Sequence, residues 1–370
     1  MPERDGMVRP GSSVERITRP IGRLVAATRQ QGRFEHLVGK HLLRVSHAPE
    51  AEARLRELRP AAVVVTNPFG SLEGTTAAVA LRLGIPVFAM IPSWDNISTK
   101  RRMEIPYDGY LLWSERQAAE LREFYPNRSS APVRRTGAVQ FDVFFQDRFT
   151  EPRAAWCARH GLPPERPVIV YAVGSPNFLD EVPGAVAFAE RVAAGELGDV
   201  TLLVRPHPIH DEGELEHHLA GTGERVVVQR TARPGEKRHQ RTQSADAVLD
   251  WVSTFRHADV VVNLSSTVTV DAAICDTPVV SLDYDPSPGA PHQVLIREIN
   301  RTWTHFAPVA RSGGVWMAAD PDELGEAVRT YLATPELHRE GRRAIVTDVC
   351  GPADGRSGHR LAEAIRELAG

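Results

Sequence analysis

The strongest candidate for binding chemistry is a polar sequence between an apolar strand and a helix. Residues 260–263 (VVVN) form a β-branched run, Ser265 and Ser266 follow it, and a helix is expected over 267–275. The first N–H groups of a helix have no partner inside the helix, and its dipole is positive at that end. This start can therefore bind phosphate, and the two hydroxyls can add hydrogen bonds. The alternative is ordinary serine capping of a packed helix, which stabilises it by about 1 kcal/mol.

An acidic residue lies one turn further along the same expected helix. Asp271 follows Thr267 by four residues, so the two side chains share a helix face. A carboxylate in this place could accept hydrogen bonds from the hydroxyls of a ribose. The alternative is a surface aspartate that the helix dipole favours.

A second candidate is the sequence Arg205-Pro206-His207-Pro208, which follows an apolar run at 201–204. The two prolines restrict the backbone on either side of the imidazole. Histidine is suited to acid–base catalysis or to donating to phosphate, and arginine can form two parallel hydrogen bonds with a phosphate. The alternative is a rigid structural turn with an exposed histidine.

A third candidate is the loop at Gly174 and Ser175, which follows the apolar run 168–172. A glycine at the end of a strand allows a ligand to approach the backbone closely. An ordinary strand-to-loop turn would have the same composition.

A fourth candidate, Ser93-Trp94-Asp95-Asn96, follows the apolar run 87–91. An indole between polar side chains at the end of a strand is typical of a platform on which a sugar stacks. The alternative is that Trp94 only anchors the loop.

Composition excludes several classes of protein. The 370 residues carry a net charge of −3, so no basic excess indicates binding to nucleic acid. The three cysteines form no C-x-x-C pair, which argues against a zinc site and favours a reducing compartment. No apolar run approaches the ~20 residues of a membrane span. We expect a cytoplasmic protein without transmembrane segment, metal or cofactor, for which a peripheral contact with a membrane stays open.

The elements that must position these residues alternate between apolar strands and helices. Strands are expected at 61–66, 87–91, 109–113, 133–137, 168–172, 201–204, 225–229, 260–263 and 278–282, with helices between them. A proline-rich sequence at 163–167 separates two such series. The sequence thus predicts a disordered terminus at 1–14, one domain at 15–155 and a second at 156–370. The basic sequence 233–241 is expected to be a solvated loop, with a lid over phosphates as the alternative.

Several of these sequences, in this order, resemble a known family. They are SWDNISTK, YDGYLLWSERQ, RRTGAVQFDVF, VIVYAVGS, LLVRPHP, ADVVVNLSSTVTVDAAICDTPVV and DGRSGHRLAEAI. Together they resemble the bacterial surface-polysaccharide transferases of the GT-B fold. More distantly they are similar to CDP-glycerol glycerophosphotransferases and UDP-N-acetylglucosamine 2-epimerases.

The resemblance implies an α/β fold of two Rossmann-like domains, whose parallel sheets face each other across a cleft, with the last helix packing back on the first domain. It implies that the nucleotide donor binds the second domain through Gly174, Ser175, Ser265, Ser266, Thr267 and Asp271, with Asp271 in the place of a ribose-binding glutamate. His207 corresponds to the catalytic histidine of the R-x-H-P motif, and Arg205 precedes it. The acceptor would bind the first domain, near Ser93, Trp94, Asp95 and Asn96.

The expected function is metal-independent transfer of a sugar from a nucleotide-sugar donor to a carbohydrate or lipid-linked acceptor. Helix N–H groups and side-chain donors would stabilise the leaving nucleoside diphosphate. A CDP-glycerol-type glycerophosphotransferase is one alternative. A non-catalytic nucleotide-sugar-binding partner of another transferase is a second, because no strand with a glycine loop is evident before residue 61.

Overall fold

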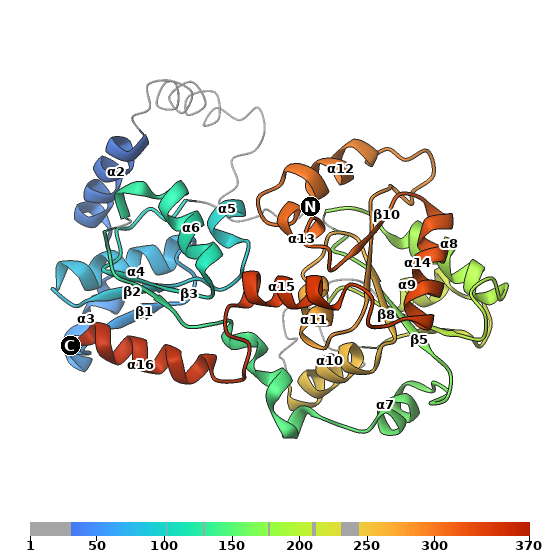
Figure 1. Cartoon of the computed structure of the whole chain (residues 1–370). Coiled ribbons are helices and arrows are strands. Elements are labelled where there is room, and N and C mark those ends of the chain that lie inside the picture. Colours follow the sequence, from blue (N-terminus) through green and yellow to red (C-terminus); the bar gives the residue numbers. More distant parts are fainter. Residues whose placement is uncertain (1–30, 101, 129, 177, 209–211, 231–243) are drawn as a thin grey trace. The chain divides into compact units, whose positions relative to one another are not determined.

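The structure is a computed structural model that describes residues 31–100, 102–128, 130–176, 178–208, 212–230 and 244–370 (Figure 1). The expected disordered terminus at 1–14 and the basic loop at 233–241 lie outside these residues. The chain forms two compact units. The first consists of Met1–Leu112, Gln117–Arg135 and Glu363–Gly370, and the second consists of Trp113–Arg116 and Thr136–Ala362.

The first unit contains a four-stranded parallel sheet in the order β1-β2-β3-β4. Its strands are β1 (Val63–Val65), β2 (Val87–Met90), β3 (Gly109–Leu112) and β4 (Val133–Arg135). Its helices are α2 (Gln31–Val45), α3 (Pro49–Leu58), α4 (Ser71–Arg82), the short α5 (Asn96–Thr99), most of α6 (Glu115–Phe124) and the 3-10 turn η1 (Pro126–Arg128). Helix α4 packs on β1 and β2, and α2 and α3 pack on α4. No strand precedes β1 among the described residues, so helices occupy this part of the unit.

The second unit contains a six-stranded parallel sheet in the order β10-β9-β8-β5-β6-β7. Its strands are β5 (Val168–Ala172), β6 (Thr201–Arg205), β7 (Val226–Val228), β8 (Val260–Asn263), β9 (Val279–Leu282) and β10 (Trp316–Ala318). The chain runs outward from β5 through β6 to β7, returns to β8 on the other side of β5, and continues to β10. The order therefore reverses between β5 and β8, and ligands of such sheets bind beyond the carboxyl ends of the strands at this reversal.

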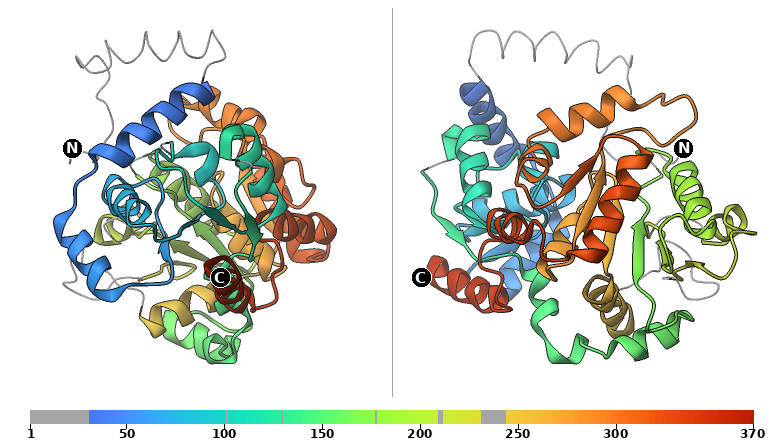
Figure 2. Two further views of the ribbon diagram at one scale, coloured as in Figure 1. Left: turned by 90° about the vertical axis from the view of Figure 1, so that its left-hand side faces the viewer. Right: turned by 45° about the vertical axis from the view of Figure 1, so that its right-hand side comes forward.

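Helices cover both faces of the second sheet (Figure 2). The helices of this unit are α7 (Arg153–His160), α8 (Val182–Ala193), α9 (Glu212–His218), α10 (Ala245–His257), α11 (Val268–Ile274), α12 (Gln293–Thr302), α13 (Ala307–Ala310), α14 (Pro321–Ala333), α15 (Arg339–Cys350) and the first part of α16 (Ser357–Ala369), with 3-10 turns η2 (Val139–Phe145) and η3 (Asp147–Phe149). Helices α8, α9 and α14 share one core with the sheet, whereas α11 packs on the sheet beside α10 and α15. All of β5 is buried, as expected of a parallel strand with both faces covered.

The local sequence explains where several helices of this unit begin and end. Asp320 caps α14, since its side chain accepts hydrogen bonds from the amides of Asp322 and Glu323, and Pro321 occupies the first turn. Ser244 caps α10 through the amide of Ala247 at 3.2 Å. Such caps satisfy N–H groups that the helix itself leaves without partners.

The expected α/β fold with two series of parallel strands is confirmed, and each of the nine expected strands is present to within two residues. The structure adds elements that the sequence did not predict: β10, α5, α9, α12, α13, α15 and the 3-10 turns η1, η2 and η3. Strand β10 has three residues and α13 has four, which is too short for a clear periodic pattern.

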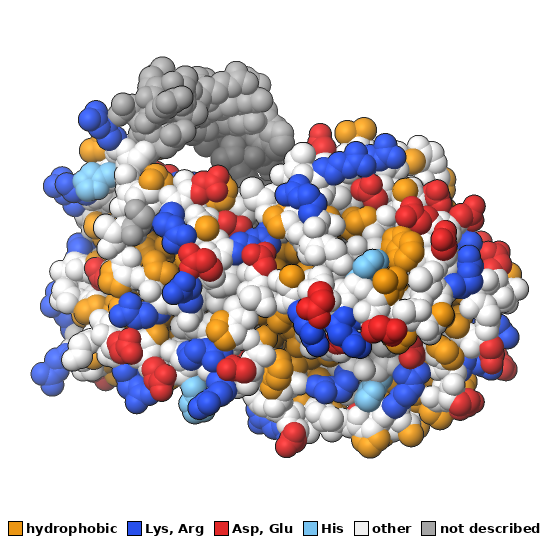
Figure 3. Space-filling view, in the orientation of Figure 1, with side chains coloured by type: hydrophobic (Ala, Val, Ile, Leu, Met, Phe, Trp, Pro, Cys, Tyr) orange, Lys and Arg blue, Asp and Glu red, His pale blue; other side chains and the backbone are white. Residues whose placement is uncertain are grey.

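The visible surface carries acidic and basic side chains in mixture, in keeping with the small net charge of −3 (Figure 3). Within the part of the chain that the structure describes, no helix has both the length and the apolar character needed to cross a lipid bilayer.

Candidate functional site

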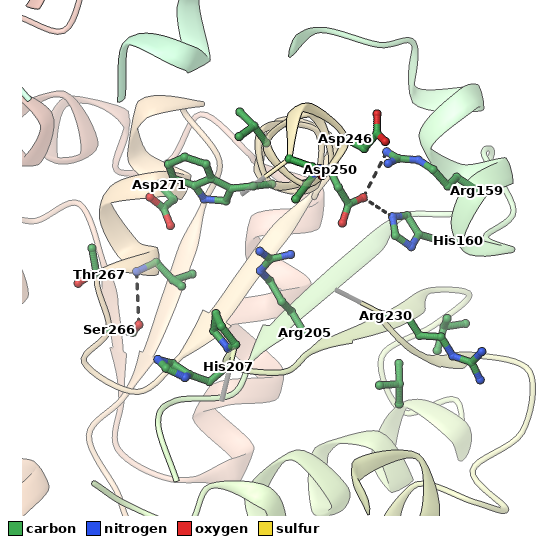
Figure 4. A pocket seen from close by; sticks show the side chains of 18 of the residues that line it. Arg159, His160, Arg205, His207, Arg230, Asp246, Asp250, Ser266, Thr267 and Asp271 are labelled. Carbon is green, nitrogen blue, oxygen red and sulfur yellow. Dashed lines mark hydrogen bonds and ion pairs between the residues drawn. The ribbon is translucent and has the colours of Figure 1, made fainter. Parts of the chain in front are cut away.

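A pocket of about 1330 Å³ lies in the second unit, at the carboxyl edge of its sheet (Figure 4). Arg205 and His207 enter it from the end of β6, and Ser266, Thr267 and Asp271 enter it from the start of α11. These five residues come from two sequence motifs about 60 positions apart. The structure thus brings together the two motifs with the clearest potential for phosphate chemistry.

The strand order explains why these motifs meet. Strands β6 and β8 are both neighbours of β5, so their carboxyl ends lie at the same edge of the sheet. Pro206 and Pro208 enclose His207 and limit its backbone freedom. The imidazole is half-buried and lines the pocket.

The start of α11 differs from the expectation of bare amides. The Ser265 amide donates to Oγ of Ser281 at 3.1 Å, and the Ser266 amide donates to Oδ1 of Asn263 at 3.1 Å. The Val268 amide donates weakly to Oγ of Ser266 at 3.4 Å. The expectation of unpaired amides is therefore wrong for these three, because side chains of β8, β9 and the turn itself already accept from them.

The same turn gives its two serines different places. Ser265 has a left-handed backbone with φ of 46°, and its hydroxyl donates to Oδ1 of Asn300 at 2.6 Å. Its side chain is thus engaged in the fold and does not line the pocket. Ser266 and the exposed Thr267 do line it. The side-chain hydroxyls of Ser266 and Thr267 are donors that this turn offers to the pocket.

Asp271 is buried at the wall of the pocket. Burial raises the pKa of its carboxyl to about 7, although a hydrogen bond with the side chain of Trp251 and the positive charge of Arg205 act against this shift. Close to neutral pH the carboxyl is therefore protonated in a large fraction of molecules. A protonated Asp271 adds no negative charge beside a bound anion and can donate one hydrogen bond.

Arg205 provides positive charge in the middle of the pocket. Its guanidinium lies between Asp271 and Asp250, as Figure 4 shows. The Nη1 group donates to Oε1 of Gln229 at 2.7 Å, and the guanidinium carbon lies 5.7 Å from the centre of the Phe255 ring. The side chain is half-buried, so it meets both the core and the pocket.

Gly174 and Ser175 follow β5 but do not line this pocket. A Cβ at position 174 would overlap Oε1 of Glu181, which receives a hydrogen bond from the Gly174 backbone. The glycine is thus required by a buried side chain of the same unit. Burial raises the pKa of the Glu181 carboxyl to about 8. Nucleotide binding by Gly174 and Ser175 stays a prediction.

Ser93, Trp94, Asp95 and Asn96 lie in the first unit, after β2. The Asp95 carboxylate accepts from Oγ of Ser93 at 2.7 Å, from Nδ2 of Asn96 at 3.0 Å and from Oγ1 of Thr99 at 2.9 Å. The side chain of Trp94 is only 2% exposed, so its ring is buried and presents no face for stacking. The acceptor-side role of the four residues stays a prediction.

Other polar residues of the pocket were not found from the sequence. Arg159 and His160 come from the end of α7, and Asp250 comes from the middle of α10. Nε2 of His160 lies 2.6 Å from Oδ1 of Asp250, and Nη2 of Arg159 lies 3.2 Å from the same oxygen. No motif joins positions 160 and 250, so the sequence holds no signal for this cluster.

Asp283 and Asp285, which follow β9, already have protein partners. Asp283 accepts from Nδ2 of Asn300 at 2.9 Å and pairs with Arg301 at 3.2 Å. Asp285 accepts from the amides of Ser287 and His292. Among the described residues, no three His, Cys, Asp or Glu side chains are arranged to hold a metal ion.

Comparison with known proteins places the fold. No protein-family model matches the sequence, and no curated protein matches it. The structure is similar to that of UDP-GlcNAc 2-epimerase from Neisseria meningitidis bound to UDP-GlcNAc, with a TM-score of 0.55, 13% identity, and coverage of 89% of this chain and 81% of the epimerase. It is also similar to a glycosyltransferase from Rickettsia africae, with a TM-score of 0.52, 9% identity, and coverage of 86% and 79%.

A further similar structure is that of the wall teichoic acid polymerase TagF. Its TM-score is 0.51 at 12% identity, and the match covers 77% of this chain and 69% of the polymerase. At these identities the likeness concerns the fold alone. The chain has a GT-B-type α/β fold, as its resemblance to surface-polysaccharide transferases implies.

Proposed function

We propose that the protein is a glycosyltransferase that moves a sugar from a nucleoside-diphosphate donor to a carbohydrate or lipid-linked acceptor. The observation that carries this proposal is the meeting of Arg205, His207, Ser266 and Thr267 in one pocket of the second unit. The pocket lies where a doubly wound sheet binds its ligands. Guanidinium, imidazole and hydroxyl groups, which line it, are hydrogen-bond donors that bind phosphate in proteins.

The leaving group of this reaction is a nucleoside diphosphate, which carries at least two negative charges. Arg205 would pair with them through its guanidinium, and the hydroxyls of Ser266 and Thr267 would donate hydrogen bonds. Because the amides of residues 265 and 266 are already used within the fold, side chains carry this task. Asp271, which protonates with a pKa of about 7, would face the ribose as a neutral acid. No metal ion takes part in this proposal.

His207 has two possible roles. As an imidazolium it would donate to the leaving phosphate, and as a neutral imidazole it would accept a proton from the acceptor hydroxyl. Its place between two prolines suits either role, since both require a ring held in one direction.

A panel of nucleotides tests the proposal. UDP, GDP, CDP, TDP and CMP are added to the full chain with EDTA, and thermal unfolding is measured. A ligand at 100 times its dissociation constant should stabilise the protein by about 2.7 kcal/mol. We expect one nucleoside diphosphate to raise the unfolding temperature clearly more than CMP does. Absence of a shift both in EDTA and with added Mg²⁺ would refute donor binding, and a shift that needs added Mg²⁺ would refute its metal independence.

Two substitutions separate binding from chemistry. Ser266→Ala should weaken the affinity for the selected diphosphate about tenfold, because a hydrogen bond to a charged group is lost. His207→Ala should change this affinity less but slow sugar transfer by about 10²-fold or more. Equal effects of both substitutions on affinity alone would contradict the catalytic role of His207.

The two other functions remain distinguishable in the same experiments. Turnover of CDP-glycerol without turnover of any nucleotide sugar would indicate a glycerophosphotransferase. Binding without turnover, together with a stable complex with a second protein, would indicate a non-catalytic partner.

A further inference from the structure

A buried amide lies directly behind the pocket wall. Gln229 follows β7, its side chain is 0% exposed, and its backbone amide donates to the Val204 carbonyl at 2.9 Å. Its side-chain oxygen Oε1 accepts from Nη1 of Arg205 at 2.7 Å. The amide therefore joins the end of β7 to the cation that protrudes from the end of β6.

The orientation of this amide is determined by its other contacts. Nε2 of Gln229 donates to Oδ2 of Asp250 and to Oγ1 of Thr254, both at 2.7 Å. The Thr254 hydroxyl gives its single proton to the Asp250 carbonyl at 2.7 Å, so towards Gln229 its oxygen can only accept. Asp250 and Thr254 therefore both need a donor, and only the NH₂ group of Gln229 can supply it. Oε1 must therefore face Arg205.

Asp250 is in turn held from the opposite side. Oδ1 of Asp250 lies 2.6 Å from Nε2 of His160 and 3.2 Å from Nη2 of Arg159. Burial alone would raise the pKa of the Asp250 carboxyl, but the hydrogen bond with His160 and the charges of Arg205 and Arg159 lower it. Asp250 is thus a carboxylate that gives the Gln229 amide a charged anchor.

We propose that Gln229 is the positioning residue that holds the Arg205 guanidinium at the pocket wall for the donor diphosphate. The inference rests on the proposed function, and it adds a residue that does not itself line the pocket. The neutral amide oxygen of Gln229 orients the guanidinium and leaves its positive charge in place. A carboxylate in the same position would neutralise that charge. Fixing the guanidinium before the ligand arrives reduces the ordering that binding costs.

A double-mutant cycle tests this role in the full chain. The probe is whichever of UDP, CDP, GDP and TDP binds the wild type, and its phosphate-free nucleoside is titrated in parallel by calorimetry. The variants are Gln229→Met, Arg205→Met and the double variant. Thr254→Val is the matched control, because it removes another partner of the Gln229 amide and leaves the contact with Arg205 in place.

We expect Gln229→Met to weaken binding of the diphosphate about tenfold and binding of the nucleoside less than about twofold. In the Arg205→Met background the same substitution should have no further effect, since it acts through the guanidinium. Thr254→Val should lower thermal stability but keep the wild-type affinity.

Several outcomes would overturn the inference. Unchanged affinity of Gln229→Met for the diphosphate would do so, as would equal losses for diphosphate and nucleoside or additive effects in the double variant. If Gln229→Met is too unstable to titrate, wild-type affinity of Arg205→Met for the diphosphate would also overturn it, because the guanidinium that Gln229 holds would then have no part in binding. Failure of the wild type to bind any nucleoside diphosphate refutes instead the proposed function on which the inference depends.

Discussion

Glu181 shows at the scale of one residue how burial changes acid–base behaviour. Its carboxyl is buried, Oε1 receives a hydrogen bond from the Gly174 backbone, and Oε2 has no hydrogen-bond partner. Burial raises its pKa from 4.5 to about 8, because the charged form loses water. The native state therefore holds this proton over a pH range in which the unfolded chain releases it.

We predict that this proton makes stability depend on pH. Because the native pKa is the higher one, the stabilisation is complete below pH 4.5 and is lost as the pH rises to about 8. Relative to Glu181→Gln, the wild type should lose unfolding free energy on the order of 1.4 kcal/mol for each pH step of one within this range. Urea unfolding at pH 5, 6.5, 8 and 9 measures this difference, with Glu190→Gln on the exposed side of α8 as control. Parallel profiles of wild type and Glu181→Gln would show that the prediction is wrong.

Helix α11, which presents Ser266, Thr267 and Asp271, is held in place by its contact with α15. Arg342 of α15 is 0% exposed and donates to Oδ1 of Asp276, just beyond the end of α11, at 3.0 Å. It also donates to the carbonyls of Leu337 at 2.6 Å and Pro335 at 2.9 Å. One buried guanidinium thus connects the helix of the site to the polypeptide before α15.

We predict that Arg342→Met lowers the unfolding free energy by about 2 kcal/mol or more, because a fully buried guanidinium loses its hydrogen bonds to Asp276 and to two backbone carbonyls. Arg339 is the matched control: it pairs with the other oxygen of Asp276 at 2.6 Å, but its side chain is 43% exposed. Arg339→Met should cost less than about 1 kcal/mol, as solvent weakens exposed ion pairs. Chemical unfolding of both variants measures the two changes in unfolding free energy. Equal losses in the two variants would contradict the connecting role of Arg342.

At the scale of the whole molecule, the two units have separate parallel sheets and separate cores. The candidate pocket is lined by residues of the second unit alone. If the donor binds there, its stabilising effect should first reach the elements that line the pocket.

We therefore predict that a bound nucleoside diphosphate slows amide hydrogen exchange after β6, around β7 and at the start of α11. Helices α2 and α3 of the first unit should exchange at the rate of the free protein, because they contribute no residue to the pocket. Exchange measured by mass spectrometry with and without ligand tests this. Protection confined to the first unit would place the donor elsewhere.

The amino-acid sequence was sufficient to predict the α/β class, nine of the ten strands of the described residues and the two motifs at Arg205 and Ser266. This was possible because buried parallel strands are continuous β-branched runs, and because proline and serine mark the turns after them. These patterns lie within a few consecutive residues, so they can be recognised without knowing which elements pack together. A strand of three residues such as β10 is too short to show such a pattern, and it was not predicted.

Which groups meet became clear only from the folded chain. The order of the sheet places β6 and β8 on either side of β5, which joins the two motifs in one pocket. Helix packing pairs further groups: α10 brings Asp250 to Gln229 after β7, 21 positions away, and α7 brings His160 to Asp250, across 90 positions. In the same way the Ser265 amide donates to the Ser281 hydroxyl of the neighbouring strand β9, 16 positions later. A hydrogen bond between distant positions depends on which strand ends and helices become neighbours, and no local pattern of residues carries that information.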